Sequence, residues 1–421
     1  MELSNIQREI VYSDAKNIIV DAGAGSGKTR VLTERVKRIL ESGANPKSIV
    51  VITFTNDAAD ELKKRLSGTP GIKKCFVGTI HSYANSILKK TGKQYDIFSE
   101  YYQTQFMEYL INKYARYCSM QDYMDFLKYD KQVAKGKLQS SEIVFKFSSS
   151  KVYHELMKLL GREYNDSYNE TVITLCEKNN VLFFDDLIRL STEYFNESNT
   201  QLEYLFVDEL QDIGYLEYGF LKALDAKHNF CIGDDFQSIF AFKGGDVEIF
   251  LSLMNNDDWT SYFLSENYRT AKSILTYANA IIQKANNIIK KEVICKNENV
   301  GKLEFVAKSN LDKFLSDLDE TEDWLLLTRS NKELYQIDTV LNKLNKKHYC
   351  VKRSSDGAKF NKVKDEKCIK VMTVHASKGL EAENVALYGK FPVKGTSNDS
   401  DEIKVYYVGI TRSKNRCSIF I

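Results

Sequence analysis

The chain has 421 residues, of which 43% are hydrophobic and 28% charged, and its formal net charge is +2. This length suggests two or three domains, and the composition is that of a soluble globular protein whose overall charge does not by itself indicate nucleic-acid binding. The eight cysteines form no C-x-x-C pair and no stretch approaches the roughly 18 apolar residues of a membrane span, which argues against a zinc site, a disulfide framework and a membrane protein. Because the N-terminus also lacks the pattern of a signal peptide, we expect a protein of the reducing cytoplasm.

The first predicted elements surround a glycine-rich loop. A short apolar strand, residues 18–20, leads through Asp21 into AGAGSGKT and then into a helical pattern. Such a loop presents backbone N–H groups to an anion, with Lys28 placed for the β- and γ-phosphates and the Thr29 hydroxyl for a Mg²⁺ ion. The alternative is a glycine-rich turn that carries a lysine by chance, but the flanking strand and helix favour a nucleoside triphosphate site. Its expected loop residues are Ala22, Gly23, Ala24, Gly25, Ser26, Gly27, Lys28 and Thr29.

Strand and helix patterns then alternate along the chain. A buried strand at 49–53 is followed by a helical pattern at 54–66. This alternation predicts an α/β fold with a parallel sheet covered by helices. Residues 99–180 are rich in Tyr, Lys, Phe and Asn with helical periodicity, and we interpret them as a helical insertion. A second β/α pattern begins near residue 263.

Two later strands each end in carboxylates. Residues 204–208 lead into Glu209, and residues 229–235 are followed closely by Gln237. The carboxyl ends of parallel strands carry ligand groups in such folds. Asp208 is therefore a candidate Mg²⁺ ligand, Glu209 a candidate acceptor for the proton of an attacking water, and Gln237 a candidate γ-phosphate contact. Taken alone, an acid pair at a strand end is also compatible with a solvated cap.

Transfer of a phosphoryl group also calls for cations beyond the loop lysine. Arg269 in LSENYRT and Arg412 in VYYVGITRSK are the candidates. Either arginine alone is equally compatible with a solvated surface side chain.

Taken in order, these motifs resemble those of the UvrD, Rep and PcrA group of superfamily 1A DNA helicases, over most of the chain. The matching segments are LSNIQREIV, AGAGSGKTR, VITFTNDAADEL, GTIHSYA, VDELQD, GDDFQSIFAFKGG, LSENYRT, VMTVHASKGLEAENV and VYYVGITRSK. The resemblance implies two RecA-like lobes with ATP and Mg²⁺ between them. It further implies hydrolysis coupled to 3′ to 5′ movement on single-stranded DNA, entered from a 3′ tail or a gap.

The resemblance also suggests roles for single residues. Gln7 would read the adenine, with Arg30 beside the phosphate loop. Tyr268 would stack on the base and Glu381 would contact the ribose, while Arg269 and Arg412 would be arginine fingers. The expected DNA contacts are Phe54, Thr55, Asn56, Thr79, His81, Phe240, Phe242, Lys243 and His375. Core packing for the aromatic residues and a structural role for the histidines remain the alternatives.

The implied domains are a first lobe at 1–98 and 181–262, a helical subdomain at 99–180 and a second lobe at 263–421. Between residues 331 and 371 there is too little sequence for the 2B subdomain of the family, so we expect it to be absent. This favours translocation over processive strand separation. Leu210, Phe240 and Phe242 also depart from the family's aromatic residues. The alternative function is a nucleic-acid-sensing regulatory ATPase that serves a nuclease partner, as in Gabija-type antiviral defence.

Overall fold

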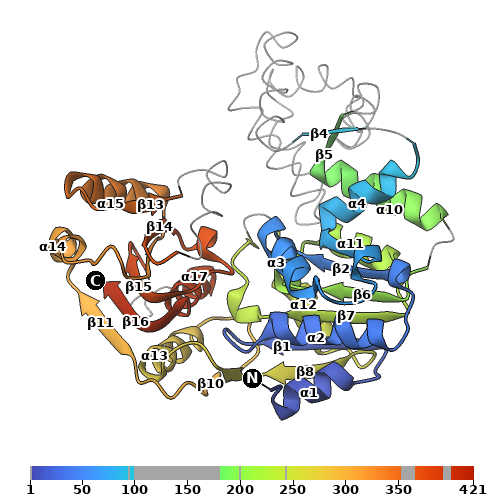
Figure 1. The fold of residues 1–421 in the computed structure, drawn as a ribbon, viewed down its shortest axis with the longest axis horizontal. Helices are drawn as coiled ribbons and strands as arrows, with labels where there is room; N and C mark the ends of the chain where they lie inside the picture. The colour runs from blue at the N-terminus through green and yellow to red at the C-terminus, as the bar shows by residue number, and fades with distance from the viewer. Residues whose placement is uncertain are drawn as a thin grey trace, which may run out of the picture. The chain divides into compact units, whose positions relative to one another are not determined.

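The computed structural model describes residues 2–92, 95–98, 181–198, 201–241, 244–351, 366–391 and 400–421 (Figure 1). The predicted helical subdomain at 99–180, together with Phe242 and Lys243, lies outside the described residues. The chain divides into two compact units: Met1–Val77, Tyr204–Ile213 and His228–Ile421 form the first, and Gly78–Glu203 and Gly214–Lys227 form the second. The domain boundaries inferred from the sequence therefore stay a prediction.

The first sheet has six strands in the order β3-β2-β6-β7-β1-β8. Its strands are β1 (Asn17–Ala22), β2 (Ile49–Thr53), β3 (Phe76–Thr79), β6 (Tyr204–Val207), β7 (His228–Gly233) and β8 (Thr260–Leu264). Strand β1 runs parallel to both β7 and β8, and β6 runs parallel to β2 and β7. Residues Ile18 and Val20 of β1 pack against buried apolar residues of α2, and Ile19 between them points to the opposite face. Both faces are thus buried, as a parallel sheet requires.

The helices around this sheet follow from local sequence signals. They are α1 (Asn5–Tyr12), α2 (Lys28–Glu41), α3 (Asn56–Leu66) and α12 (Val247–Met254). Ser4 and Gln7 form a capping box that starts α1, and the Thr55 hydroxyl accepts a hydrogen bond from the Ala58 N–H to start α3. Gly43, with φ of 91°, follows the end of α2, where a left-handed residue terminates a helix.

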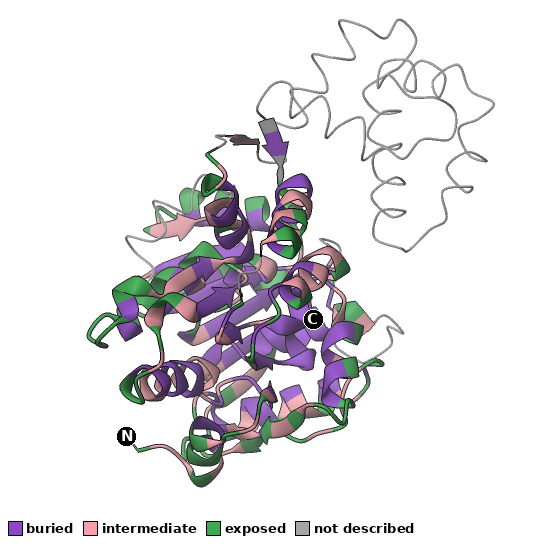
Figure 2. Ribbon diagram, turned by 90° about the vertical axis from the view of Figure 1, so that its right-hand side faces the viewer, coloured by how far each residue is buried: buried purple, intermediate pink, exposed green. Residues whose placement is uncertain are grey.

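The second sheet also has six strands, in the order β11-β16-β15-β12-β14-β13, and all its neighbouring strands run parallel. Its strands are β11 (Lys302–Val306), β12 (Trp324–Thr328), β13 (His348–Cys350), β14 (Ile369–Thr373), β15 (Ala382–Tyr388) and β16 (Ser413–Phe420). Its helices are α13 (Lys272–Ile282), α14 (Leu311–Ser316), α15 (Asn331–Lys343) and α17 (Ser400–Ile410). Two parallel sheets flanked by helices confirm the predicted α/β class and match two RecA-like lobes; their strands are largely buried (Figure 2).

The core of the second lobe extends into the first. Ala24 of the glycine-rich loop and Phe236, Ile239 and Phe240, which follow β7, belong to one cluster of buried side chains with residues of α13, α17 and β12. The ring of Phe236 meets that of Tyr407 edge to face, with centroids 5.4 Å apart. A two-stranded pair, β9 (Glu266–Asn267) with β10 (Ile294–Cys295), lies in the chain between the two sheets. The segments that carry the predicted motifs are therefore packed against one another rather than spread over the surface.

The second compact unit is small in its described part. It contains α4 (Ile80–Lys89), α10 (Phe184–Glu197) and α11 (Tyr215–Ala223), with the parallel pair β4 (Asp96–Phe98) and β5 (Val181–Phe183). The Ser191 hydroxyl donates to the backbone carbonyl of Ala84 at 2.9 Å, and the rings of Tyr83 and Phe220 lie 6.2 Å apart. These contacts hold the three helices together.

Two observations concern the classes excluded from composition. The described cysteines, at positions 75, 231, 295, 350, 368 and 417, are all free thiols, and burial raises the pKa of Cys231 and Cys417 to about 12. No helix among the described residues is both long and apolar enough to cross a membrane.

Candidate active site

The glycine-rich loop lies between β1 and α2 and forms a cradle of backbone. Gly25 and Gly27 have φ of 68° and 87°, which glycine adopts without strain. A Cβ atom on Gly25 would lie 2.7 Å from the side-chain nitrogen of Asn267, so the space also requires glycine there. Helix α2 begins at Lys28 and receives no side-chain cap. Its first N–H groups are thus available to an anion.

Buried polar atoms of this cradle lack hydrogen-bond partners in the described structure. They are Nζ of Lys28 and Oγ of Ser26. Lys28 Nζ lies 3.3 Å from a carboxylate oxygen of Glu209. Burial alone would lower the pKa of Lys28, but Glu209, Asp234 and Asp208 outweigh it and raise the pKa. A buried ammonium group and an unpartnered hydroxyl beside free N–H groups fit the phosphates of a nucleotide.

The two acids that follow β6 differ in protonation. Burial first, and then the charge of Glu209, raises the pKa of Asp208 to about 7. For Glu209, burial acts in the same direction, but Lys28 and Lys378 outweigh it and hold the pKa well below its usual range. Glu209 itself has φ of 55°, a left-handed conformation that is uncommon outside glycine and occurs at functional sites. An ionised carboxylate held in this way can accept a proton, whereas Asp208 favours a cation beside it.

The donor set at this point fits Mg²⁺. Asp208 is buried at the end of β6, and Thr29 follows the loop lysine at the start of α2. A carboxylate and a hydroxyl together with phosphate oxygens are the ligands that Mg²⁺ takes in nucleotide sites. Asp208 and Thr29 are therefore the residues that would hold the ion, which would neutralise charge on the phosphates.

Arg269 and Arg412 come together although they lie on different elements. Arg269 donates to the backbone carbonyl of Thr411 at 2.7 Å and contacts Glu381 at 3.3 Å, while its Nε atom is buried without a partner. Arg412 donates to the side-chain oxygen of Gln237 at 2.6 Å. Burial first, and then the charge of Arg269, lowers the pKa of Arg412 to about 9. Two neighbouring guanidinium groups in a buried place favour an anion between them.

Gln237 connects this pair to the first sheet. Its amide nitrogen donates to a carboxylate oxygen of Asp234 at 2.6 Å, and its side-chain oxygen accepts from Arg412. The side chain is buried. A γ-phosphate contact by Gln237 would thus be sensed by groups of both lobes.

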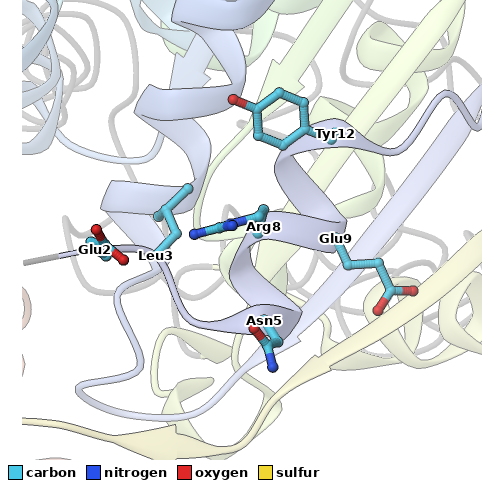
Figure 3. A pocket seen from close by; sticks show the side chains of 6 residues that line it. All are labelled: Glu2, Leu3, Asn5, Arg8, Glu9 and Tyr12. Carbon is cyan, nitrogen blue, oxygen red and sulfur yellow. The ribbon is translucent and has the colours of Figure 1, made fainter.

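Three residues expected to hold the base and ribose have other partners here. The amide nitrogen of Gln7 donates to the carbonyl of Ser26 at 2.9 Å, so Gln7 holds the phosphate loop. Tyr268 is 39% exposed and its hydroxyl donates to Glu266, and Glu381 pairs with Arg269 and Lys414. The adenine and ribose roles therefore stay predictions, as does the role of Arg30. Another face of α1 lines a shallow pocket that does not include Gln7 (Figure 3), formed by Glu2, Leu3, Asn5, Arg8, Glu9 and Tyr12.

Sequence reasoning missed two residues of this site. Lys378 donates to Asp212 and, at 2.8 Å, to the backbone carbonyl of Gln237, and it lies 3.5 Å from Glu209. Asn267 donates to the loop carbonyl of Ala24 at 2.6 Å and is fully buried. Both residues lie inside motifs already recognised, VHASKGLE and SENYRT, and only their positions there could have indicated a role.

Part of the expected DNA surface is assembled. The rings of Phe54 and Phe240 stack with centroids 5.2 Å apart, and His375 lies 6.2 Å from Phe240. The Lys378 ammonium group stands 5.3 Å from the Phe240 centroid. Phe240 is only 7% exposed, so core packing accounts for most of its ring. We call Phe54, Phe240 and His375 the aromatic cluster.

The remaining expected DNA contacts stand in other surroundings. Thr55 and Thr79 act as helix N-caps, accepting from the N–H groups of Ala58 and Ser82. Asn56 is the first residue of α3. His81 packs edge to face on Phe184 at 4.8 Å, and burial lowers its pKa. DNA contacts by these residues stay predictions.

This fold and site define a P-loop nucleotide-binding protein with two RecA-like lobes. Comparison with known families shows which one: the UvrD/REP helicase N-terminal domain matches residues 3–258, and the UvrD-like helicase C-terminal domain matches residues 354–421. The chain belongs to the UvrD-like family of ATP-dependent DNA helicases.

Individual relatives agree with this assignment. A probable DNA helicase of Mycoplasma pneumoniae is 27% identical over 98% of this chain and 82% of its own length. The ATP-dependent DNA helicase PcrA of Bacillus subtilis is 29% identical over 73% of this chain and 43% of its own, and the helicase Rep of Buchnera aphidicola 28% over 72% and 46%. The match therefore spans less than half the length of these PcrA and Rep relatives. Among solved structures, an arterivirus helicase, nonstructural protein 10, aligns over 99% of this chain and 62% of its own at 11% identity and a TM-score of 0.40, which adds nothing to the assignment.

Proposed function

We propose that this protein is an ATP-dependent motor that moves 3′ to 5′ on single-stranded DNA. The observation that carries the proposal is the position of Lys378. Its ammonium group contacts Asp212 and the Gln237 carbonyl beside the nucleotide site, and the same group faces the ring of Phe240 in the aromatic cluster. One second-lobe cation thus connects the place where ATP is cleaved to the place where bases would stack.

In the proposed mechanism the lobes close on ATP. Lys28 and the loop N–H groups bind the phosphates, and Glu209 accepts the proton of the attacking water. Arg269 and Arg412 stabilise the charge that develops on the transferring phosphoryl group. Loss of the γ-phosphate removes the anion that holds Gln237 and both arginines together, and the lobes can then separate.

Movement on DNA would use the aromatic cluster. Phe54 lies directly after β2 of the first lobe, and His375 follows β14 of the second. Base stacking on such side chains contributes about 1–3 kcal/mol per base and tolerates any sequence. When the lobes open and close, these contacts would shift relative to one another along the strand. A single-stranded region at a 3′ tail or a gap is the expected point of entry.

The decisive experiment measures ATP hydrolysis with and without single-stranded DNA, followed by strand displacement on duplexes with a 3′ or a 5′ tail. We expect DNA to stimulate hydrolysis, and any displacement to require the 3′ tail. Matched reactions with Glu209→Gln show that the activity belongs to this site. Hydrolysis that is indifferent to DNA would refute the proposal.

The same assays address the second candidate, a DNA-sensing regulatory ATPase with a nuclease partner in the cytoplasm. DNA-stimulated hydrolysis without displacement, together with co-purification of a nuclease, would favour that function. The segment between β12 and β14 bears on the choice, because the described residues there are only α15 and β13 and the 2B subdomain is expected to be absent. Displacement by the isolated chain would count against the regulatory function.

A further inference from the structure

A buried ion cluster joins the two lobes beside the nucleotide site. Lys291, which follows α13 of the second lobe, contacts three aspartates of the first: Asp21 at the end of β1, and Asp234 and Asp235 after β7. Its Nζ atom lies 2.5 Å from Asp235 and 3.3 Å from Asp234. The three carboxylate side chains have no exposed area and that of Lys291 is 9% exposed.

The geometry of the cluster is that of an occupied cation site. One oxygen from each of Asp21, Asp234 and Asp235 lies close enough to the others to hold a metal ion, and the ammonium group of Lys291 stands among them. The same ammonium group lies 4.2 Å from the ring centroid of Phe236. The backbone N–H of Ile289 adds a hydrogen bond to Asp235 at 2.5 Å. Removal of the lysine would leave three buried acids without their cation, which is costly.

The cluster bears directly on Gln237. One oxygen of Asp234 faces Lys291, and the other accepts the amide nitrogen of Gln237 at 2.6 Å. An ionised carboxylate can only accept hydrogen bonds, so it selects the NH₂ side of the amide. The side-chain oxygen of Gln237 is then left for Arg412, which donates to it at 2.6 Å. A protonated or displaced Asp234 would no longer select this amide orientation.

We propose that Lys291 is a positioning residue for γ-phosphate sensing: its ammonium group fixes the Asp234 carboxylate, which in turn orients the Gln237 amide toward Arg412. This inference rests on the proposed function, because that function assigns Gln237 and Arg412 to the γ-phosphate. Lys291 itself touches neither of these side chains in the contacts described, so its effect passes through Asp234.

The test compares nucleotide affinities, which require neither DNA nor turnover. Dissociation constants for ADP and for a non-hydrolysable ATP analogue are measured with Mg²⁺ for the wild type, Lys291→Met and Lys290→Met. Lys290 is an exposed neighbour whose ammonium group bonds only a backbone carbonyl, that of Gln283, among the contacts described, so it is the matched control. We expect Lys291→Met to lose about ten- to a hundredfold in preference for the analogue over ADP, the scale of one hydrogen bond to a charged group. Lys290→Met should keep the wild-type ratio.

A double variant separates positioning from simple charge balance. Asp21→Asn combined with Lys291→Met restores the formal net charge of the cluster, and thermal unfolding reports how much stability returns. If Lys291 positions Gln237, the double variant regains stability but not the preference for the analogue. If the preference returns together with stability, Lys291 only balances charge and the proposal is overturned. The double variant also provides the answer if Lys291→Met alone does not fold.

Failure of the proposed function has a different signature. A wild-type protein that binds the analogue and ADP equally would remove the γ-phosphate role of Gln237, and the role of Lys291 with it. A wild-type protein that prefers the analogue but hydrolyses ATP without regard to DNA would refute the motor function and leave the role of Lys291 intact.

Discussion

The side-chain oxygen of Gln237 accepts a hydrogen bond from Arg412 at 2.6 Å, although the two residues are 175 positions apart in the chain. Gln237 follows a strand of the first sheet and Arg412 precedes the last strand of the second. Both side chains are buried. A nucleotide held by Lys28 would therefore be read by both lobes, and the predictions below follow from this arrangement.

Glu209→Gln should leave ATP binding in place and lower the turnover number at least about a hundredfold, the lower range for loss of a general base. The amide keeps the shape of the side chain but cannot accept the proton. Nucleotide affinity by fluorescence titration and steady-state hydrolysis are the measurements. Glu34→Gln, on the outside of α2 where Glu34 pairs with Lys37, is the control. Unchanged turnover in Glu209→Gln would remove its assigned role.

Arg412→Ala should lower turnover by about 10³-fold or more, in the range measured for arginine fingers. Its guanidinium group is buried beside Arg269, so the loss of stabilising charge at the phosphate is not replaced by solvent. Arg65→Ala serves as the control, because Arg65 is exposed on α3 and pairs with Glu61. Thermal unfolding of each variant shows whether the fold is intact. An intact Arg412→Ala variant with normal turnover would contradict the assignment.

Phe54→Ala should weaken binding of single-stranded DNA about 5- to 150-fold, which corresponds to about 1–3 kcal/mol for one stacked base. Phe54 is partly buried against Phe240, so part of its ring remains for a base. The measurement is fluorescence anisotropy with a labelled oligonucleotide at fixed salt. Phe305→Ala, at a side chain that is 48% exposed in the second lobe, should bind DNA as the wild type does. Equal losses in both variants would show that the aromatic cluster does not bind DNA.

Asp21 should make the stability of the protein depend on pH. Burial raises its pKa to about 7, with opposition from Lys291 and support from Asp235 and Asp234. Because the folded pKa exceeds the unfolded value, the contribution to the free energy of unfolding is largest below about pH 4 and declines as pH rises to about 7. Asp21→Asn removes this decline and should gain stability relative to the wild type between pH 5 and pH 8. Urea denaturation at both pH values measures the difference, and a difference that does not change with pH would contradict the assigned shift.

Much of the fold could be predicted because its signals are local. The strand predicted at 49–53 is β2 (Ile49–Thr53), and the strand predicted at 204–208 is β6 (Tyr204–Val207), one residue shorter. The glycine-rich loop also follows from local rules, since positive φ and an uncapped helix start depend on neighbouring residues. The strand predicted at 229–235 ends at Gly233, because Asp234 leaves the sheet to cap the turn with a bond from the Phe236 N–H.

What the sequence by itself determined about this protein is the class of fold, the family and the order of its motifs, because these depend on periodicity and on short residue patterns. Only the tertiary structure decided which side chains meet. Lys378 beside Glu209, Asn267 on the loop carbonyl of Ala24, and Lys291 among three aspartates are contacts between segments far apart in the chain. The physical reason is that parallel strands bring their carboxyl ends to one edge, and burial between two lobes then makes each unpaired charge costly. Partners are selected by that cost, which no local pattern records.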